Sequence, residues 1–239
     1  MTLWCKAWRE SRVRFLVSIA VMIVVGGGFI QEGLTFLNEN RSAQVTYTLL
    51  VESRVYGSMF PLLFVMLCLL LGLGGLLRER AAGTVAYTLA LPVTRRQLAV
   101  TRAAMGILQV AALALLPALL VPTLSPVLLN ESYPVADALR FSLRWTAWGA
   151  VFFAIGFLWS SIISGEYTAA VACVLTPFLY LPMMLTIAGD EDRWPAANYM
   201  EYMHGGRTNE IALLPLVVMT FACAVIVAAA AAVTARRDF

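Results

Sequence analysis

Residues 211–233 form an apolar run without a single Asp, Glu, Lys, Arg or His. Runs of this kind are the feature that most limits which fold the chain can adopt. The hydrocarbon core of a bilayer is about 30 Å thick, so a helix needs roughly 20 apolar residues to cross it. The chain of 239 residues has only 13% charged residues and a mean hydropathy of +0.81, whereas a soluble domain carries about 25% charged residues. The sequence therefore predicts an integral membrane protein.

Apolar runs of this kind predict an all-α protein with a single transmembrane domain over residues 1–239. Six spans are expected, at residues 15–30, 58–77, 103–124, 145–164, 168–188 and 211–233. Each run is flanked by charged or turn-rich sequence, which is typical of helices that end at a membrane surface.

The first 14 residues predict an interfacial amphipathic helix, because apolar and charged side chains fall on different helical faces. The apolar face comprises Leu3, Trp4, Ala7, Trp8 and Phe15, and the charged face comprises Lys6, Arg9 and Glu10. An ordinary charged lead-in to the first span is the alternative interpretation.

The arginine distribution predicts a multi-pass protein of the cytoplasmic (inner) membrane with both termini in the cytoplasm. In that orientation the cytoplasmic segments hold 11 of the 17 basic residues: Lys6, Arg9, Arg12, Arg14, Arg78, Arg80, Arg95, Arg96, Arg102, Arg236 and Arg237. The outer loops hold Arg41, Arg54, Arg140, Arg144, Arg193 and Arg207. Basic residues concentrate on the cytoplasmic side of membrane proteins, so the net charge of +3 reflects topology and indicates no nucleic-acid partner.

The cytoplasmic loop 78–102 is predicted to contain a short helix, a stop and the start of the third span. A mostly apolar stretch follows Gly83-Thr84 and ends before Pro92, which disfavours helix at the residue before it. Thr94 and Gln97 then have the spacing of a capping box. The short helix is too short to be stable alone in water and therefore needs a partner.

This loop resembles that of the permease subunits of type-2 ATP-binding-cassette (ABC) exporters. The matching residues are Glu79, Gly83, Thr84, Leu91, Pro92, Val93, Thr94 and Arg95. The likeness extends over the whole chain: an amphipathic N-terminal helix, six spans and an Arg-rich C-terminal end.

The resemblance implies that the loop helix docks on a separate nucleotide-binding subunit, and that two permeases, copies or homologues, pair with two ATPases in the membrane. The ATPase-coupling residues would be Arg78, Glu79, Arg80, Gly83, Thr84, Val85, Leu89, Leu91, Pro92, Thr94 and Arg95. ATP and Mg would then bind to the partner, and no cofactor to this chain.

The sequence agrees with this division of labour, because a P-loop needs Gly-Lys-Ser/Thr and the one lysine, Lys6, is followed by Ala7. An intramembrane hydrolase is disfavoured, because the one histidine, His204, is expected in an outer loop. A secondary transporter or channel usually places ionisable residues within its spans, and the expected spans contain none. A subunit that transmits force without transporting is a further alternative.

Two other groups of side chains have functional interpretations. Met200, Met203 and His204 are soft ligands that suit copper, but a loop with scattered methionines is the favoured interpretation, and no metal site is expected. The few polar groups in the spans are possible substrate-pathway residues: Gln109, Ser160, Ser161, Thr176 and Tyr180. Because they are so few, the expected substrate is apolar or amphiphilic. Small residues, namely Gly26 to Gly28, Gly72, Gly74, Gly75 and Ala228 to Ala232, are expected to allow close helix packing.

Overall fold

The computed structural model describes residues 3–39, 47, 51–56, 59–73, 94–129, 132–163, 168–177, 203 and 213–236. Within these ranges the regular structure is helical, with no strand. The helices are α1 (Leu3–Glu39), the π-helical turn η1 (Glu52–Tyr56), α3 (Phe60–Gly72), α6 (Arg95–Leu129), α7 (Val135–Ile162) and α10 (Leu213–Arg236), with a further short helix at Thr168–Pro177. The predicted all-α fold is confirmed.

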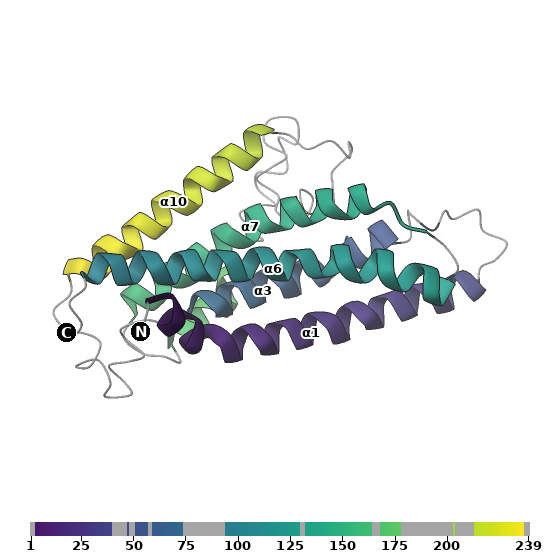
Figure 1. The fold of residues 1–239 in the computed structure, drawn as a ribbon, viewed down its shortest axis with the longest axis horizontal. Coiled ribbons are helices and arrows are strands. Elements are labelled where there is room, and N and C mark those ends of the chain that lie inside the picture. Colours follow the sequence, from purple (N-terminus) through teal and green to yellow (C-terminus); the bar gives the residue numbers. More distant parts are fainter. Residues whose placement is uncertain are drawn as a thin grey trace.

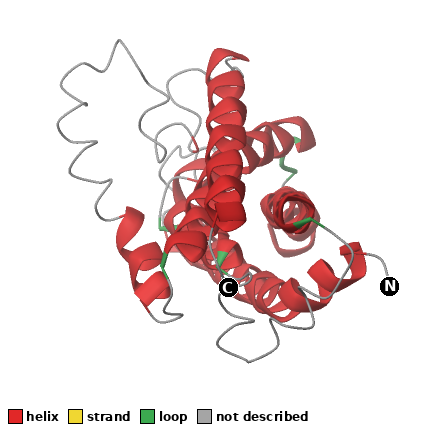
Figure 2. Cartoon of the chain, turned by 90° about the vertical axis from the view of Figure 1, so that its left-hand side faces the viewer, coloured by secondary structure: helices red, strands yellow, loops and turns green. Residues whose placement is uncertain are grey.

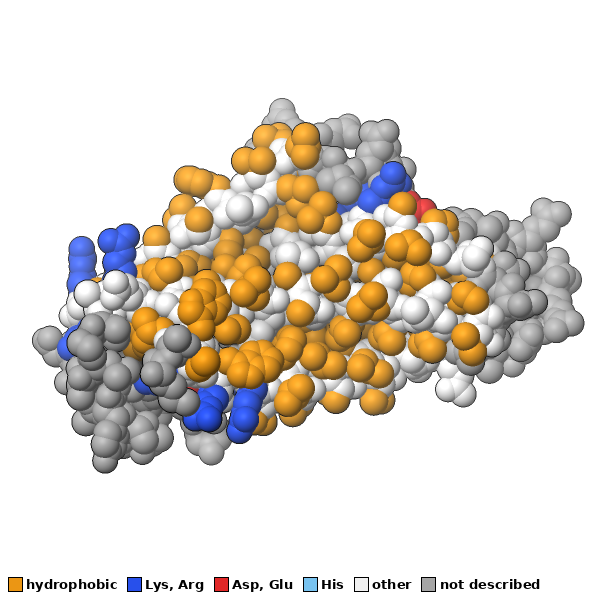
Figure 3. All heavy atoms as spheres, viewed as in Figure 1, with side chains coloured by type: hydrophobic (Ala, Val, Ile, Leu, Met, Phe, Trp, Pro, Cys, Tyr) orange, Lys and Arg blue, Asp and Glu red, His pale blue; other side chains and the backbone are white. Residues whose placement is uncertain are grey.

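Four of these helices are long and apolar enough to cross a membrane: Leu3–Gln31 of α1, Arg95–Val127 of α6, Val135–Ile162 and Leu213–Arg236. Two shorter apolar helices, Phe60–Gly72 and Thr168–Pro177, lie within the expected second and fifth spans. On the face drawn in Figure 3, Lys and Arg side chains lie toward the ends of the molecule, and hydrophobic side chains fill the band between them. The chain is thus a multi-pass membrane protein.

Helices α1, α3, α6 and α7 run in alternating directions through one bundle, and α10 runs in the same direction as α7 (Figure 1). Helix α7 packs against α3, α6 and α10, while α1 packs mainly against α6 and also contacts α3. Both chain termini therefore lie at the same end (Figure 1), which Figure 2 views end-on. We call this end the loop end, because α3 finishes there and α6 begins there, on either side of residues 74–93. The opposite end is the far end.

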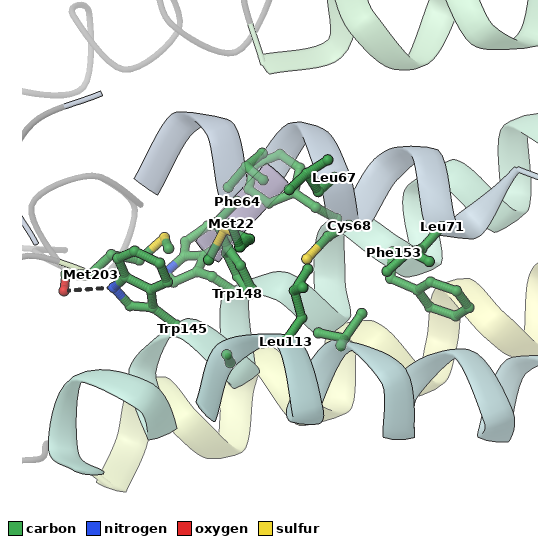
Figure 4. Close-up of a cluster of buried hydrophobic side chains, with 14 of the residues drawn as sticks. Met22, Phe64, Leu67, Cys68, Leu71, Leu113, Trp145, Trp148, Phe153 and Met203 are labelled. Carbon is green, nitrogen blue, oxygen red and sulfur yellow. Dashed lines mark hydrogen bonds between the residues drawn. The ribbon is translucent and has the colours of Figure 1, made fainter. Parts of the chain in front are cut away.

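Aromatic side chains fill the core toward the far end. The Tyr56 ring stacks on Phe141 with ring centroids 4.1 Å apart, and the Trp145 ring lies 5.5 Å from Phe60 and 5.0 Å from Phe64. Figure 4 shows Trp145 beside Phe64, with its indole nitrogen donating a hydrogen bond to the backbone oxygen of Met203 at 3.3 Å. These buried rings hold α3 and α7 together.

Nearer the loop end, α3 and α7 approach each other backbone to backbone. A Cβ added at Gly72 would lie 2.4 Å from the Phe153 carbonyl oxygen, and one added at Gly156 would lie 2.4 Å from the Leu69 carbonyl oxygen. No larger residue fits at either position without moving a helix. Small residues are what allow membrane helices to approach so closely.

The predicted packing role holds for some of the small residues and not for others. Gly26 faces Phe60, with 3.1 Å from an added Cβ to the ring, and Ala230 and Ala231 are buried. Gly27 and Gly28 do not pack against another described helix, because no described atom lies within 4 Å of a Cβ added there. Gly74 and Gly75 lie outside the described residues.

Two helices extend beyond the apolar runs that revealed them. Helix α1 runs unbroken from Leu3 to Glu39, so the expected interfacial helix and first span form one helix. Helix α7 begins at Val135, which places Arg144 inside a helix and leaves its side chain only 2% exposed, whereas the sequence analysis placed it in an outer loop. Hydropathy locates the part of a helix that lies in hydrocarbon, and helices continue past that boundary.

Candidate functional site at the loop end

The expected coupling segment lies largely outside the described residues. This applies to Arg78, Glu79, Arg80, Gly83, Thr84, Val85, Leu89, Leu91 and Pro92. Its last two members, Thr94 and Arg95, are described, and so is Leu73, which follows α3. The candidate site therefore consists of the contacts at the two ends of this segment, namely the end of α3 and the start of α6. We call these two places the anchors of the loop.

The anchor at α6 is the capping box that the sequence predicts. The Gln97 backbone N–H donates to the Thr94 side-chain oxygen at 3.2 Å, and the Thr94 backbone N–H donates to the Gln97 side-chain oxygen at 3.2 Å. Two N–H groups that a helix start leaves unpaired are thus satisfied reciprocally. Helix α6 consequently has a defined first turn at Arg95.

Helix α6 is joined to the N-terminal part of α1 by an ion pair and a hydrogen bond. Arg102 Nη2 lies 2.7 Å from Glu10 Oε2, and Lys6 Nζ lies 3.7 Å from the other oxygen of the same carboxylate. Two turns further along α6, Gln109 Nε2 donates to Ser11 Oγ at 2.7 Å. The face of α1 that was expected to meet lipid headgroups therefore makes part of its contacts within the protein.

The end of α3 is held from two sides. Arg14 of α1 donates to the Leu70 carbonyl oxygen at 3.4 Å. The Ser160 hydroxyl of α7, which donates to the Phe157 carbonyl oxygen at 2.8 Å, also lies 3.4 Å from the Gly72 carbonyl oxygen. The Leu70 carbonyl also accepts from the Leu73 N–H at 3.2 Å. The last carbonyls of a helix carry the negative end of its dipole, so a guanidinium is favourable there. The Arg14 and Ser160 contacts are both long, and they supplement the backbone contact at Gly72 described above.

These groups surround a pocket of about 40 Å³ that is open to the surface. We call it the loop-end pocket; its lining comprises Ala7, Glu10, Ser11, Arg14, Leu71, Gly72, Leu73, Arg102, Gly106, Gln109, Phe153 and Phe157. The Phe153 ring closes its floor against Gly106, where an added Cβ would lie 2.1 Å from a ring atom. Two guanidinium groups and one carboxylate leave the lining with a net positive charge.

Of the predicted pathway residues, Gln109 and Ser160 both lie at this end. Gln109 lines the loop-end pocket, and Ser160 contacts its rim through Gly72. Ser161 is bonded elsewhere, donating to the Phe157 carbonyl at 2.9 Å and accepting from Thr234 of α10 at 3.4 Å.

Thr176 also lies away from the pocket, accepting a hydrogen bond from Trp159 Nε1 at 3.2 Å. Tyr180 lies outside the described residues. The five polar residues therefore do not form one continuous pathway among the residues that are described.

Comparison with known proteins shows the family to which the chain belongs. Residues 5–193 match the family described as ABC-2 family transporter protein. The chain belongs to this family. A search of curated proteins found no individual match. The match includes α1, α3, α6 and α7, and with them all helices that line the loop-end pocket.

As a member of this family the permease is the membrane subunit of an ABC transporter. Within the ranges that the structure describes, no group of three or more His, Cys, Asp or Glu side chains could hold a metal ion. Met203 is described and fully buried, whereas Met200 and His204 lie outside the described residues.

At the far end of the permease lies a buried polar group that the sequence analysis missed. The Arg144 guanidinium carbon lies 5.6 Å from the centre of the Phe141 ring, a distance at which a cation is attracted to a ring face. Tyr56 and Tyr133 are buried near it, and burial raises the pKa of both phenols far above their ordinary value. They remain neutral hydroxyls at any physiological pH. The sequence analysis used only the apolar run that begins at Trp145. The helix-compatible sequence from Val135 to Ile162, taken as a whole, would have placed Arg144 in a helix.

Proposed function

We propose that the permease exports an apolar or amphiphilic substrate across the cytoplasmic membrane, using ATP hydrolysed by separate ABC ATPase subunits. ATP and Mg bind to those subunits, and the segment Arg78–Arg95 is where an ATPase docks. A second copy of the permease or a homologue completes the membrane part, and both termini lie in the cytoplasm. Membership of the ABC-2 family supports an ATPase partner in general.

One observation carries the proposal: both anchor points of the segment 74–93 are held by the contacts of the loop end. At one anchor, α3 touches α7 backbone to backbone through Gly72 and Gly156. At the other, α6 is paired with α1 through Arg102 and Glu10. A displacement of the segment therefore moves α3 and α6 directly, and α7 and α1 through these contacts.

Helix α10 follows α7 in this scheme. Cys223 Sγ lies 3.4 Å from the Ala150 carbonyl oxygen, and Thr234 Oγ1 lies 3.4 Å from Ser161 Oγ, so α10 contacts α7 at two levels. Interfaces that pack this tightly shift as units rather than deform continuously. A displacement at the loop end is thus transmitted to every long helix that the structure describes.

The substrate class follows from the scarcity of polar groups in the expected spans. The hydroxyls of Ser161, Thr176 and Thr220 each bond a carbonyl of the preceding turn of their own helix, so they present little polarity to a substrate. A charged substrate in a low-dielectric pathway needs compensating groups. An apolar or amphiphilic molecule does not.

The test purifies the permease with the ABC ATPase that accompanies it and reconstitutes the complex in proteoliposomes. Glu79→Ala and Leu89→Asp are expected to insert normally but to lose ATPase copurification or permease-dependent ATP hydrolysis. Asp137→Ala serves as control, because it removes an acid that is paired with Arg140 at the far end. Parent-level ATPase yield and hydrolysis in both variants would refute the docking role.

The same preparation separates export from force transmission. Uptake of a hydrophobic dye into inside-out vesicles, driven by ATP, is expected for the parent complex and not for Leu89→Asp. Coupled ATP hydrolysis without movement of apolar, amphiphilic or hydrophilic compounds would instead identify a subunit that transmits force.

A further inference from the structure

The loop-end pocket contains a buried acceptor that the contacts described so far do not use. Gln109 is 3% exposed, and its amide nitrogen is occupied by Ser11. Its Oε1 atom is fully buried and accepts no hydrogen bond from the part of the chain that the structure describes. Leaving a buried acceptor unsatisfied costs about 1–3 kcal/mol, so a ligand with a donor group has something to gain at this site.

The pocket also concentrates positive charge. Arg14 and Arg102 line it together with the single carboxylate of Glu10. Guanidinium groups are the side chains best suited to phosphate, because their N–H groups match its oxygens in pairs. A ligand that fits must therefore bring a negative charge and a hydrogen-bond donor.

The position of the pocket along α1 indicates where such a ligand comes from. Trp4 and Trp8 are 45% and 39% exposed, and exposed indoles mark the level of lipid headgroups. Arg14 follows Trp8 by six residues, which is about 9 Å of helix. The lining of the pocket includes Ala7 and Glu10, which flank Trp8, so the pocket lies close to the headgroup level, where a lipid phosphate can reach it.

We propose that the loop-end pocket binds the phosphate group of an anionic phospholipid whose headgroup carries a hydroxyl, as phosphatidylglycerol does. The phosphate lies against Arg14 and Arg102, and the hydroxyl donates to Gln109 Oε1. Basic pockets between helices on the cytoplasmic side of membrane proteins bind anionic headgroups in this way. A bound headgroup bridges α1 and α6 next to the start of the coupling segment, and so it tightens the loop end.

Native mass spectrometry of the permease in detergent tests the proposal, with short-chain phosphatidylglycerol as ligand and phosphatidylcholine of equal chain length as comparison. Phosphatidylglycerol is expected to bind saturably and at least about tenfold more tightly, a difference of about 1.4 kcal/mol. Inorganic phosphate and glycerol phosphate are added as competitors. Competition shows that the phosphate group alone suffices, and its absence shows that the acyl chains contribute; both support a phosphate site.

Three variants locate the site. Gln109→Glu has the same shape and puts a carboxylate beside the two arginines, so it is expected to weaken phosphatidylglycerol binding about tenfold or more while leaving the fold intact. Arg14→Gln is expected to weaken it about fivefold, which corresponds to one cation near a charged lipid. Arg12→Gln removes an exposed cation from the same helix and is the matched control, with a change of less than about twofold.

Two results would overturn the proposal. One is equal binding of phosphatidylglycerol and phosphatidylcholine to the parent protein. The other is equal weakening in Arg12→Gln and Gln109→Glu, which would show that surface charge attracts the lipid and that the pocket has no part in it. Size-exclusion profiles of each variant show whether it is folded. If Arg14→Gln does not fold, the binding measured for Gln109→Glu tests the proposal.

Discussion

Replacing Gly156 by alanine should separate α3 from α7 at a single point. The new Cβ would lie 2.4 Å from the Leu69 carbonyl oxygen, and backbone cannot rotate away as a side chain can. Ordinary contact begins near 3.4 Å, so the helices must move apart by about 1 Å, and a gap of that size forfeits a quarter to a half of each facing contact.

The net effect is expected to be a loss of about 2 kcal/mol. Overpacking of this kind costs about 1–3 kcal/mol, and the weakened contacts along the separated helices add to that cost. Alanine returns about 1 kcal/mol through its higher helix propensity. Reversible unfolding in mixed micelles, followed by tryptophan fluorescence, measures this difference in free energy of unfolding.

Gly28→Ala is the matched control, because no atom of the described ranges lies within 4 Å of a Cβ added there. It should gain stability by about 0.5–1 kcal/mol, since it has the propensity benefit without the clash. Gly72→Ala should behave like Gly156→Ala, and the double variant should lose less than the sum, because one separation of the helices relieves both clashes. If Gly156→Ala equals or exceeds the parent in stability, the close backbone approach does not exist.

Three further outcomes are expected. Thr94→Ala should reduce the hydrogen-exchange protection of the first turn of α6 by about 1 kcal/mol, and unchanged protection would contradict the capping box. Arg102→Gln should destabilise the protein by about 1–3 kcal/mol because it leaves a partly buried carboxylate with a weaker partner, whereas the exposed Arg96→Gln should stay within about 0.5 kcal/mol; similar values for both would show that the ion pair contributes little. Cysteines introduced at Asn38 and Asp190 should react with an impermeant thiol reagent added to intact cells while one at Thr94 does not, and the reverse pattern would invert the topology.

Local features of the loop end could be predicted from the sequence, because they depend on residues close together in the chain. The Thr94 and Gln97 cap is such a feature, and the hydrogen bonds confirm it. Apolar runs likewise revealed the all-α membrane fold, since each crossing must satisfy its own backbone within the helix. Gln109 was singled out as a rare polar residue in a span, and it does line a pocket.

What joins the helices could not be predicted, because the partners are distant in sequence and any of several faces could meet. Ser11 and Glu10 gave no sign that they would face α6 rather than lipid headgroups. Gly156 is one glycine in an apolar run, and only the position of Leu69 gives it its role. Arg144 was assigned to a loop because a charged residue ends an apolar window even where the helix continues.

Because α1 is continuous, the first transmembrane helix extends beyond the hydrocarbon core of the membrane. At 37 residues it is about 55 Å long, well beyond the thickness of the hydrocarbon core. Had a hinge separated the first 14 residues, they could swing along the membrane surface without disturbing the span. Because α1 is one hydrogen-bonded helix, a movement imposed at Glu10 or Ser11 passes directly into the segment that crosses the membrane. The contacts that α1 makes at the loop end are therefore also contacts of its membrane span.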